Sequence, residues 1–327
     1  MTTRIPTLDL HDWRSASPQR QALITAELDA ALRHTGMFLL AGHDIPTEMT
    51  AQMRTTGREF MGLPTERKSA YAVGRPYDNG WRGLGALQAS AAGDTSGRSG
   101  APDLHEAFHT GPEHRTGDSK FDRLYYPGNK WPAEVPGLRE TTLAYTARMN
   151  RLSLDLLEVF AVTLGIEDDF FTSRSQRATW TQNVNWYPSL STVGELRDGQ
   201  MRVGPHTDFG TLTLLDRQQG AGGLEAWNAE DGWFKPPFVP GTLVVNLGDM
   251  MHEWTDGRWQ ALRHRVLAPP ASNPDEELVS LVFFFEADPD TEVRPLPAPV
   301  GGGAGKPAFI AGEQILEKVG VTLTLAG

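Results

Sequence analysis

The stretch GPHTDFGTLTLL, residues 204–215, places a histidine and an aspartate one residue apart within an otherwise apolar segment. If the segment is a β-strand, side chains at i and i+2 point to the same face, so His206 and Asp208 would lie together. On an interior face, burying an imidazole and a carboxylate is costly unless a positive charge or hydrogen bonds compensate. A bound metal ion would compensate, and the pair therefore predicts part of a metal site.

The composition limits the class of protein. The chain has 327 residues, of which 39% are hydrophobic and 22% charged, which is typical of a globular protein with a large core. The formal net charge of −11 argues against a nucleic-acid-binding surface. No apolar run reaches the roughly 20 residues of a membrane span, and the N-terminus lacks the pattern of a signal peptide. We expect a cytoplasmic protein whose partners are small molecules, with no nucleic acid and no membrane; the oligomeric state stays open.

The chain contains no cysteine, so nitrogen and oxygen donors must hold any metal. Among the nine histidines, His264 lies in QALRHRVL, a strand-like segment 56 residues after Asp208 (264 − 208). An H-x-D pair with one distant histidine is the ligand set that holds non-haem iron(II) and leaves positions open on one face. An H-x-D pair alone also fits a buried histidine that is simply hydrogen-bonded.

The periodicity of the sequence indicates two kinds of structure. Residues 15–36 predict a helix with Ser17 as its N-cap, and residues 136–165 predict one long helix because apolar residues recur at three and four. From about residue 178 the period shifts towards two, in short strands separated by Gly, Pro, Asp and Asn. Such strands predict a double-sheet β architecture such as a jelly roll. A final helix is expected over 307–319.

A family resemblance joins these features. HTDFGTLTLL, GGLEAW, PGTLVVNLGDMMHEWTDGRWQALRHRV and the upstream NVNWYP resemble the isopenicillin N synthase-like branch of the 2-oxoglutarate/iron(II) oxygenases. IPTLDL, GMFLLAGHDI and PDLHEAFHTGPE match its N-terminal portion, so the resemblance covers residues 5 to about 290. It implies a mainly β fold with helical additions: a distorted double-stranded β-helix (jelly roll) core with N-terminal helices and a long supporting helix.

The resemblance also implies how the chain is organised and what it does. We expect an N-terminal helical and mixed region over 1–120, the long helix and jelly-roll core over 121–290, and a linker and helix over 291–327, forming one integrated catalytic unit. His206, Asp208 and His264 would hold Fe(II). With 2-oxoglutarate as cosubstrate and molecular oxygen, the enzyme would hydroxylate, desaturate or cyclise a small organic molecule.

One family feature is missing. In relatives, an R-x-S pair on the last core strand binds the distal carboxylate of 2-oxoglutarate, because a planar guanidinium grips a carboxylate through two hydrogen bonds. Alignment on the FF of LVSLVFFFEADPD places Ser280 on the serine and Leu278 on the arginine. Either another cation replaces the arginine, or 2-oxoglutarate is not the cosubstrate. Arg202 would share a face with His206 on a regular strand, although Gly204 and Pro205 intervene.

The remaining predicted site residues fall into two groups. Asn185 and Tyr187 match family positions that approach the cosubstrate; alternatively they only hydrogen-bond their neighbours within a core strand. His105 and Phe108, from a segment that covers the site in relatives, and Phe283 and Phe285 are predicted substrate contacts, although both phenylalanines on the last strand also fit the core.

Three other functions compete with this interpretation. The missing arginine favours an Fe(II)/O2 oxidase of the isopenicillin N synthase type that does not use 2-oxoglutarate. A non-catalytic small-molecule-binding relative would retain the fold, but an intact set of buried ligands argues against it. A zinc hydrolase lacks the general-base glutamate of an H-E-x-x-H spacing.

Overall fold

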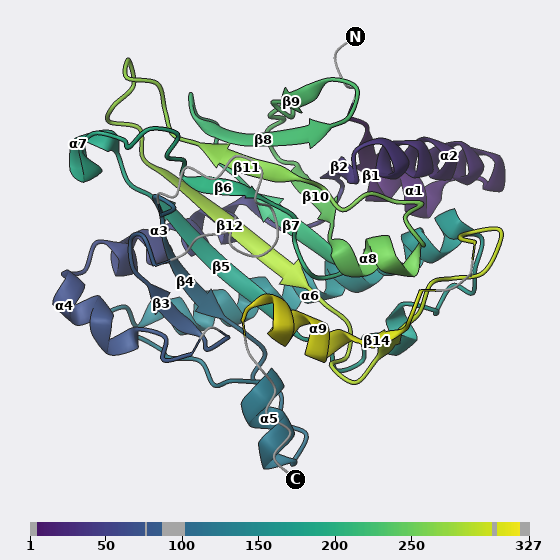
Figure 1. Ribbon diagram of the computed structural model, residues 1–327, viewed down its shortest axis with the longest axis horizontal. Helices are drawn as coiled ribbons and strands as arrows, with labels where there is room; N and C mark the ends of the chain where they lie inside the picture. Colours follow the sequence, from purple (N-terminus) through teal and green to yellow (C-terminus); the bar gives the residue numbers. More distant parts are fainter. Residues whose placement is uncertain (1–4, 76, 87–101, 303–305, 321–327) are drawn as a thin grey trace.

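The computed structural model describes residues 5–75, 77–86, 102–302 and 306–320. Within them, eight strands form a major sheet in the order β1-β2-β10-β7-β12-β5-β4-β3, and four form a minor sheet in the order β6-β11-β8-β9 (Figure 1). The strands are β1 (Thr7–Asp9), β2 (Met37–Ala41), β3 (Gly80–Arg82), β4 (Glu106–Thr110), β5 (Trp180–Tyr187), β6 (Val203–His206), β7 (Leu212–Asp216), β8 (Gly223–Asn228), β9 (Gly232–Phe234), β10 (Leu243–Leu247), β11 (His264–Leu267), β12 (Leu278–Phe285), β13 (Glu292–Val293) and β14 (Phe309–Ile310).

The predicted helices are present, although the last one, expected over 307–319, begins only at Ala311 because Phe309–Ile310 form a strand. The helix predicted over 15–36 is α2, which spans Pro18–His34; the Ser17 hydroxyl accepts a hydrogen bond from the Arg20 backbone at 3.3 Å and Pro18 occupies the first turn. The helices are α1 (Leu10–Ser15), α2 (Pro18–His34), α3 (Thr47–Met61), α4 (Thr65–Lys68), α5 (Ser119–Tyr125), α6 (Gly137–Leu164), α7 (Leu190–Val193), α8 (Asp249–Trp254) and α9 (Ala311–Lys318), with 3-10 turns at Ser69–Tyr71 and Thr172–Arg174. None of the helices in the described ranges is both long and apolar enough to cross a bilayer.

The long helix α6 covers one face of the major sheet (Figure 1). Its buried side chains, which include Tyr145, Leu156 and Phe160, join one apolar cluster with strand residues such as Leu281 and Phe283. This cluster fixes the sheet on its outer side. The opposite face of the sheet is therefore left to face the minor sheet, and the candidate site lies between the two.

The arrangement confirms the predicted fold class, a jelly-roll core with helical additions. The N-terminal region is part of the same sheet, because β2 pairs with β10 and β4 pairs with β5. Strands from the first 120 residues therefore extend the sheet that carries the site. The proposed boundaries at residues 120 and 290 remain predictions.

Candidate active site

The minor sheet brings the two histidines together. His206 ends β6 and His264 begins β11, and the two residues are partners in the antiparallel register. Asp208 Oδ1 lies 3.6 Å from His206 Nε2 and 3.9 Å from His264 Nε2. One candidate ligand atom from each of the three residues lies within 4.8 Å of the others. The three predicted metal ligands thus converge on one point.

The backbone that carries Asp208 differs from the sequence expectation. The strand does not continue through it: β6 ends at His206 and β7 begins only at Leu212. A turn holds the aspartate instead, with the Thr211 backbone donating to the Phe285 carbonyl at 3.0 Å and the Asp249 backbone donating to the Asp208 carbonyl at 2.8 Å. The turn packs so closely on Gly248 that a Cβ there would lie 2.4 Å from the Gly210 carbonyl oxygen. Glycine is therefore required at that contact.

Hydrogen bonds orient each of the three side chains. The Nδ1 atoms of His206 and His264 lie 2.9 and 3.1 Å from the carbonyl oxygens of Gly204 and Leu262. A carbonyl only accepts, so both Nδ1 atoms carry the proton and both Nε2 lone pairs are free for a metal. Asp208 Oδ2 accepts from Thr213 Oγ1 at 2.6 Å and from Asn246 Nδ2 at 2.8 Å, which leaves Oδ1 facing the histidines.

The electrostatics also suit a divalent cation. Burial and the neighbouring His264 lower the pKa of His206 to about 4, so its imidazole is neutral near pH 7. Burial alone would raise the pKa of Asp208, but the two histidines and the hydrogen bonds from Thr213 and Asn246 lower it below its ordinary value. A neutral imidazole and an ionised carboxylate are the protonation states that metal binding requires. The donor set therefore fits Fe(II).

A narrow inner cavity extends from these residues between the two sheets. The predicted cosubstrate residues Asn185, Tyr187 and Ser280 all line it. Ser280 is the register partner of Asn185, and Leu278 is the partner of Tyr187. Burial raises the pKa of Tyr187, while contacts with Asn185 and Ser280 oppose the rise. The predicted polar group is thus assembled at the inner cavity, and Leu278 lines it where relatives have arginine.

The prediction for Arg202 is wrong in its geometry. Its side chain is buried and hydrogen-bonded to Glu276. Nη1 donates to Glu276 Oε1 and Nη2 donates to the Glu276 carbonyl, both at 2.8 Å. Its guanidinium carbon lies 5.5 Å from the centre of the Tyr187 ring. Arg202 is not among the residues that line the inner cavity. The Glu276 carboxylate pairs with the guanidinium of Arg202. Arg202 therefore packs behind Tyr187, outside the lining of the inner cavity.

Arg217, which was not among the predicted site residues, does line the inner cavity. It follows β7 directly, four residues after Thr213 (217 − 213). Residues 213, 215 and 217 therefore share one face of the strand. That alternation was available in LTLLDR, but nothing in the sequence showed which strand lies beside β7.

An outer cavity of about 790 Å³ opens on the other side of the metal ligands. His105, a predicted substrate contact, lines it and donates from Nδ1 to the Arg202 carbonyl at 3.1 Å. Phe108 does not: it is buried against Phe60, with ring centres 4.5 Å apart. The alternation of β4 directs His109 to the cavity in its place.

The same alternation corrects the prediction on the last core strand. Phe283 and Phe285 are fully buried in the apolar cluster with α6 and line neither cavity. Phe284, between them, lines both cavities. The error was one of phase, because a run of three phenylalanines gives no alternation from which to tell the two faces apart.

Glu286 is a second residue that the sequence analysis missed. It lines the outer cavity, and its Oε2 is buried without a hydrogen-bond partner among the residues that the structure describes. Burial, with the nearby charge of Asp208, raises its pKa to about 8. A carboxyl group held neutral beside the metal ligands is available to donate or accept a hydrogen bond.

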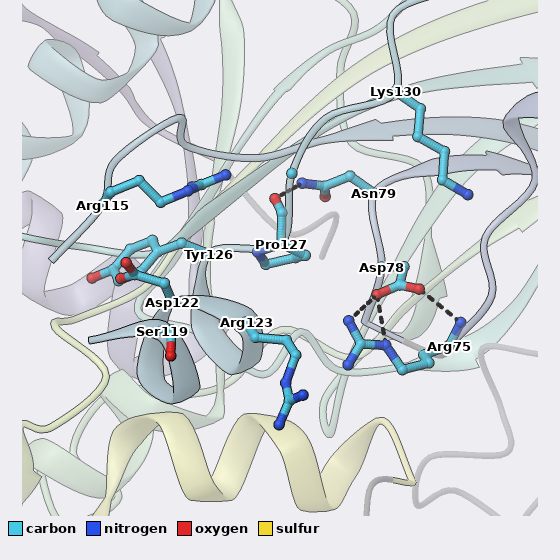
Figure 2. A pocket seen from close by; sticks show the side chains of 11 residues that line it. Arg75, Asp78, Asn79, Arg115, Ser119, Asp122, Arg123, Tyr126, Pro127 and Lys130 are labelled. Carbon is cyan, nitrogen blue, oxygen red and sulfur yellow. Dashed lines mark hydrogen bonds and ion pairs between the residues drawn. The ribbon is translucent and has the colours of Figure 1, made fainter. Parts of the chain in front are cut away.

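A shallower pocket of about 450 Å³ lies between α5 and the segment around residue 78 (Figure 2). Figure 2 shows Asp78 turned towards Arg75, whose Nε donates to Asp78 Oδ1 at 3.0 Å. Arg75, Asp78 and Asn79 also line the outer cavity, so the two hollows share a wall. None of the three candidate metal ligands lines this pocket, and it is therefore separate from the metal centre.

Comparison with known proteins agrees with this geometry. Residues 5–134 match the family described as non-haem dioxygenase in morphine synthesis N-terminal, and residues 181–287 match the 2OG-Fe(II) oxygenase superfamily. The chain is 63% identical to validamycin A dioxygenase of Streptomyces hygroscopicus subsp. limoneus over 97% of this chain and 86% of that protein. It is 31% identical to the proline hydroxylase buaE of Petromyces alliaceus over 90% and 91% of the two chains.

A solved structure supports the fold. The crystal structure of Neurospora crassa T7H with alpha-KG and thymine superposes with a TM-score of 0.83 at 22% identity, covering 96% of each chain. The sequence matches confirm an Fe(II)- and 2-oxoglutarate-dependent dioxygenase that acts on a small molecule with O2; they give no support to the oxidase, binding-protein and hydrolase alternatives. The chain belongs to the 2OG-Fe(II) oxygenase superfamily, within which the isopenicillin N synthase-like branch lies.

Proposed function

We propose that this enzyme oxidises validamycin A or a close chemical relative of it. The observation that carries the proposal is the 63% identity to validamycin A dioxygenase over 97% of the chain. The outer cavity supports it, since its lining combines acids, bases and amides such as Glu286, His109 and Asn183. A cavity of this kind suits a substrate with many hydrogen-bonding groups better than an apolar one.

In the proposed site, His206, Asp208 and His264 hold Fe(II), which when bound supplies oxygen activation coupled to decarboxylation of 2-oxoglutarate. The chain's own residues fix the geometry. The Gly204 and Leu262 carbonyls hold the Nδ1 protons of the histidines, and Thr213 and Asn246 hold the aspartate. Hydrogen bonds to the far side of a metal-binding side chain keep that side chain oriented and basic.

The cosubstrate is proposed to occupy the inner cavity and the substrate the outer one. Asn185, Tyr187 and Ser280 supply polar contacts within the inner cavity, and Leu215, Leu224 and Val282 give it apolar walls that exclude water. His105, Phe284 and Glu286 line the outer cavity and are proposed substrate contacts. Substrate and cosubstrate would then meet at His206 and Asp208, which line both cavities.

Incubation with Fe(II), 2-oxoglutarate, O2 and validamycin A tests the proposal. We expect succinate release in proportion to a product that has gained one oxygen atom, lost two hydrogen atoms or formed a ring. Proline is the matched control substrate, because a proline hydroxylase is also a relative. Turnover of proline with no product from validamycin A would overturn the substrate assignment and leave the metal site standing.

A cytoplasmic location is also proposed. The absence of cysteine and the acidic composition are compatible with it. Fractionation of cells that produce the protein from its own gene would test it, and recovery outside the cytoplasmic fraction would contradict it.

A further inference from the structure

Arg217 occupies the inner cavity on the same side as the metal-binding machinery. Thr213, Leu215 and Arg217 all line that cavity, which is the alternation of a single strand face. Thr213 donates to the metal-proximal Asp208, whereas Arg217 lies about 13 Å further along the strand, at ~3.3 Å per residue. One edge of the cavity therefore runs from the metal ligands to a guanidinium.

The register places Arg217 beside the polar group of the inner cavity. Leu281 is the partner of Asp216 on β7, so the next antiparallel position sets Ser280 opposite Arg217. On its other side Ser280 pairs with Asn185. Arg217, Ser280 and Asn185 thus form one row across three neighbouring strands. The family's arginine would stand two residues from Ser280 on its own strand, at Leu278; here an arginine reaches the same cavity from the next strand.

Arg217 is a sheltered cation with no carboxylate beside it to offset the free energy of its desolvation. Its Nη2 donates to the carbonyl oxygens of Pro236 and Pro237 at 2.8 and 2.7 Å, and its guanidinium carbon lies 5.7 Å from the Phe238 ring centre. No carboxylate in the described part of the chain forms an ion pair with it, and burial lowers its pKa. These contacts fix the outer edge of the guanidinium and leave its charge uncompensated.

Three other sheltered arginines in the same molecule are paired with carboxylates. Arg202 is bound by Glu276 at 2.8 Å, Arg265 by Glu225 at 2.7 Å, and Arg54 by Asp216. Removing a cation from water without a partner is unfavourable unless a ligand supplies the opposite charge. The difference between Arg217 and these arginines indicates that its partner is a bound anion.

We propose that Arg217 binds the distal carboxylate of 2-oxoglutarate and so replaces the arginine that is missing at Leu278. The inference rests on the proposed metal site, because the 2-oxo end of the cosubstrate must lie at His206, Asp208 and His264 for its far end to point along β7. Ser280 and Tyr187, which line the same cavity, are placed to contact the same carboxylate.

The test compares two ligands that differ only at the far end. Binding of 2-oxoglutarate and of 2-oxopentanoate, a 2-oxo acid of equal length without the distal carboxylate, is measured anaerobically with Fe(II). For the wild-type enzyme we expect tighter binding of 2-oxoglutarate. Arg217→Ala should weaken binding of 2-oxoglutarate by about 10- to 150-fold, the usual range for hydrogen bonds to a charged group. Its dissociation constant for 2-oxopentanoate should change little.

Two further variants guard against a folding defect. Arg217→Lys keeps the positive charge but loses the bidentate guanidinium. It should therefore weaken 2-oxoglutarate binding less than Arg217→Ala does. The double variant Arg217→Leu with Leu278→Arg returns the guanidinium to the family position and should regain part of the preference for 2-oxoglutarate. The surface variant Arg294→Ala is the matched control, since that side chain is exposed and pairs only locally with Glu292.

The outcomes separate the two proposals. If 2-oxoglutarate binds wild type and Arg217→Ala with equal affinity, or wild type does not prefer it over 2-oxopentanoate, the role of Arg217 is overturned and the metal site stands. If neither 2-oxo acid binds the wild-type protein with Fe(II), the metal site itself is wrong. Equal weakening of both ligands would show that Arg217 only supports the fold, which also overturns its role as the anchor.

Discussion

The two ends of the inner cavity are built in different ways. At the metal end, two of the three proposed ligands, His206 and Asp208, are separated by one residue in the chain, and the third, His264, is the register partner of His206. At the other end, the polar residues come from three strands, β5, β7 and β12, whose neighbours in the sheet are far apart in sequence. A local motif therefore specifies the first end, whereas only the sheet order specifies the second.

The largest expected effect is at the metal end. His264→Ala should reduce turnover to the background of metal in buffer, because two ligands cannot hold Fe(II) in the required geometry. The metal-free variant should unfold at a temperature close to that of the metal-free wild type, since the His264 side chain makes only one hydrogen bond within the described chain, to a backbone carbonyl. Metal content after dialysis and succinate release are the measurements.

Removal of the metal gives the matching control. A chelator should inactivate the wild-type enzyme, and added Fe(II) should restore it, while the variant stays inactive at any Fe(II) concentration. Near-wild-type turnover in His264→Ala would mean that the convergence of the three side chains is not the metal site.

The second prediction separates Arg202 from the cosubstrate end. Arg202→Ala removes the cation from the largely buried Glu276, which keeps the backbone donors of Ala221 and Gly222, so the cost should be ~3 kcal/mol of folding free energy, the lower end of the usual range for a broken buried pair. Urea unfolding measures that loss. The dissociation constant for 2-oxoglutarate, corrected for the folded fraction, should be unchanged, in contrast to Arg217→Ala. If Arg202→Ala weakened 2-oxoglutarate binding at constant stability, the assignment of the two arginines would be reversed.

This contrast shows what the sequence could and could not predict. The H-x-D pair, the capped helix at Ser17 and the long helix depend on residues close in the chain, and all three were predicted. Arg202 was chosen on strand alternation from His206, but the deciding interaction is with Glu276, 74 residues away (276 − 202). Arg217 was missed for the same reason: its place beside Ser280 depends on the pairing of β7 with β12.

The third prediction uses the two faces of β12. Phe283 is fully buried in the cluster with α6, whereas Phe284 faces the cavities. Phe283→Ala should cost ~3–5 kcal/mol of folding free energy, as is usual when a buried phenylalanine is truncated. Phe284→Ala should cost less, because its side chain already borders open space, and should instead raise the KM for substrate. Equal losses of stability in the two variants would contradict the assignment of the faces.

The smallest expected effect concerns Glu286 in the metal-free protein. Its pKa is raised from an ordinary 4.5 to about 8 by burial and by Asp208, so the folded state holds a proton that the unfolded chain has released between these pH values. The contribution of Glu286 to stability is therefore fully present below about pH 4.5 and is lost progressively as the pH rises to about 8.

Glu286→Gln cannot ionise and should lose less stability than the wild type over that window. The other ionisable groups that line the outer cavity, including His105, His206 and Lys318, are present in both proteins, and the coupling of Asp208 to Glu286 is part of the measured difference. Urea unfolding at a series of pH values measures the difference, with the exposed Glu158→Gln as the control. Parallel pH profiles for wild type and Glu286→Gln would show that the carboxyl group is ionised in the folded protein, and the outer cavity would then present a negative charge to its substrate.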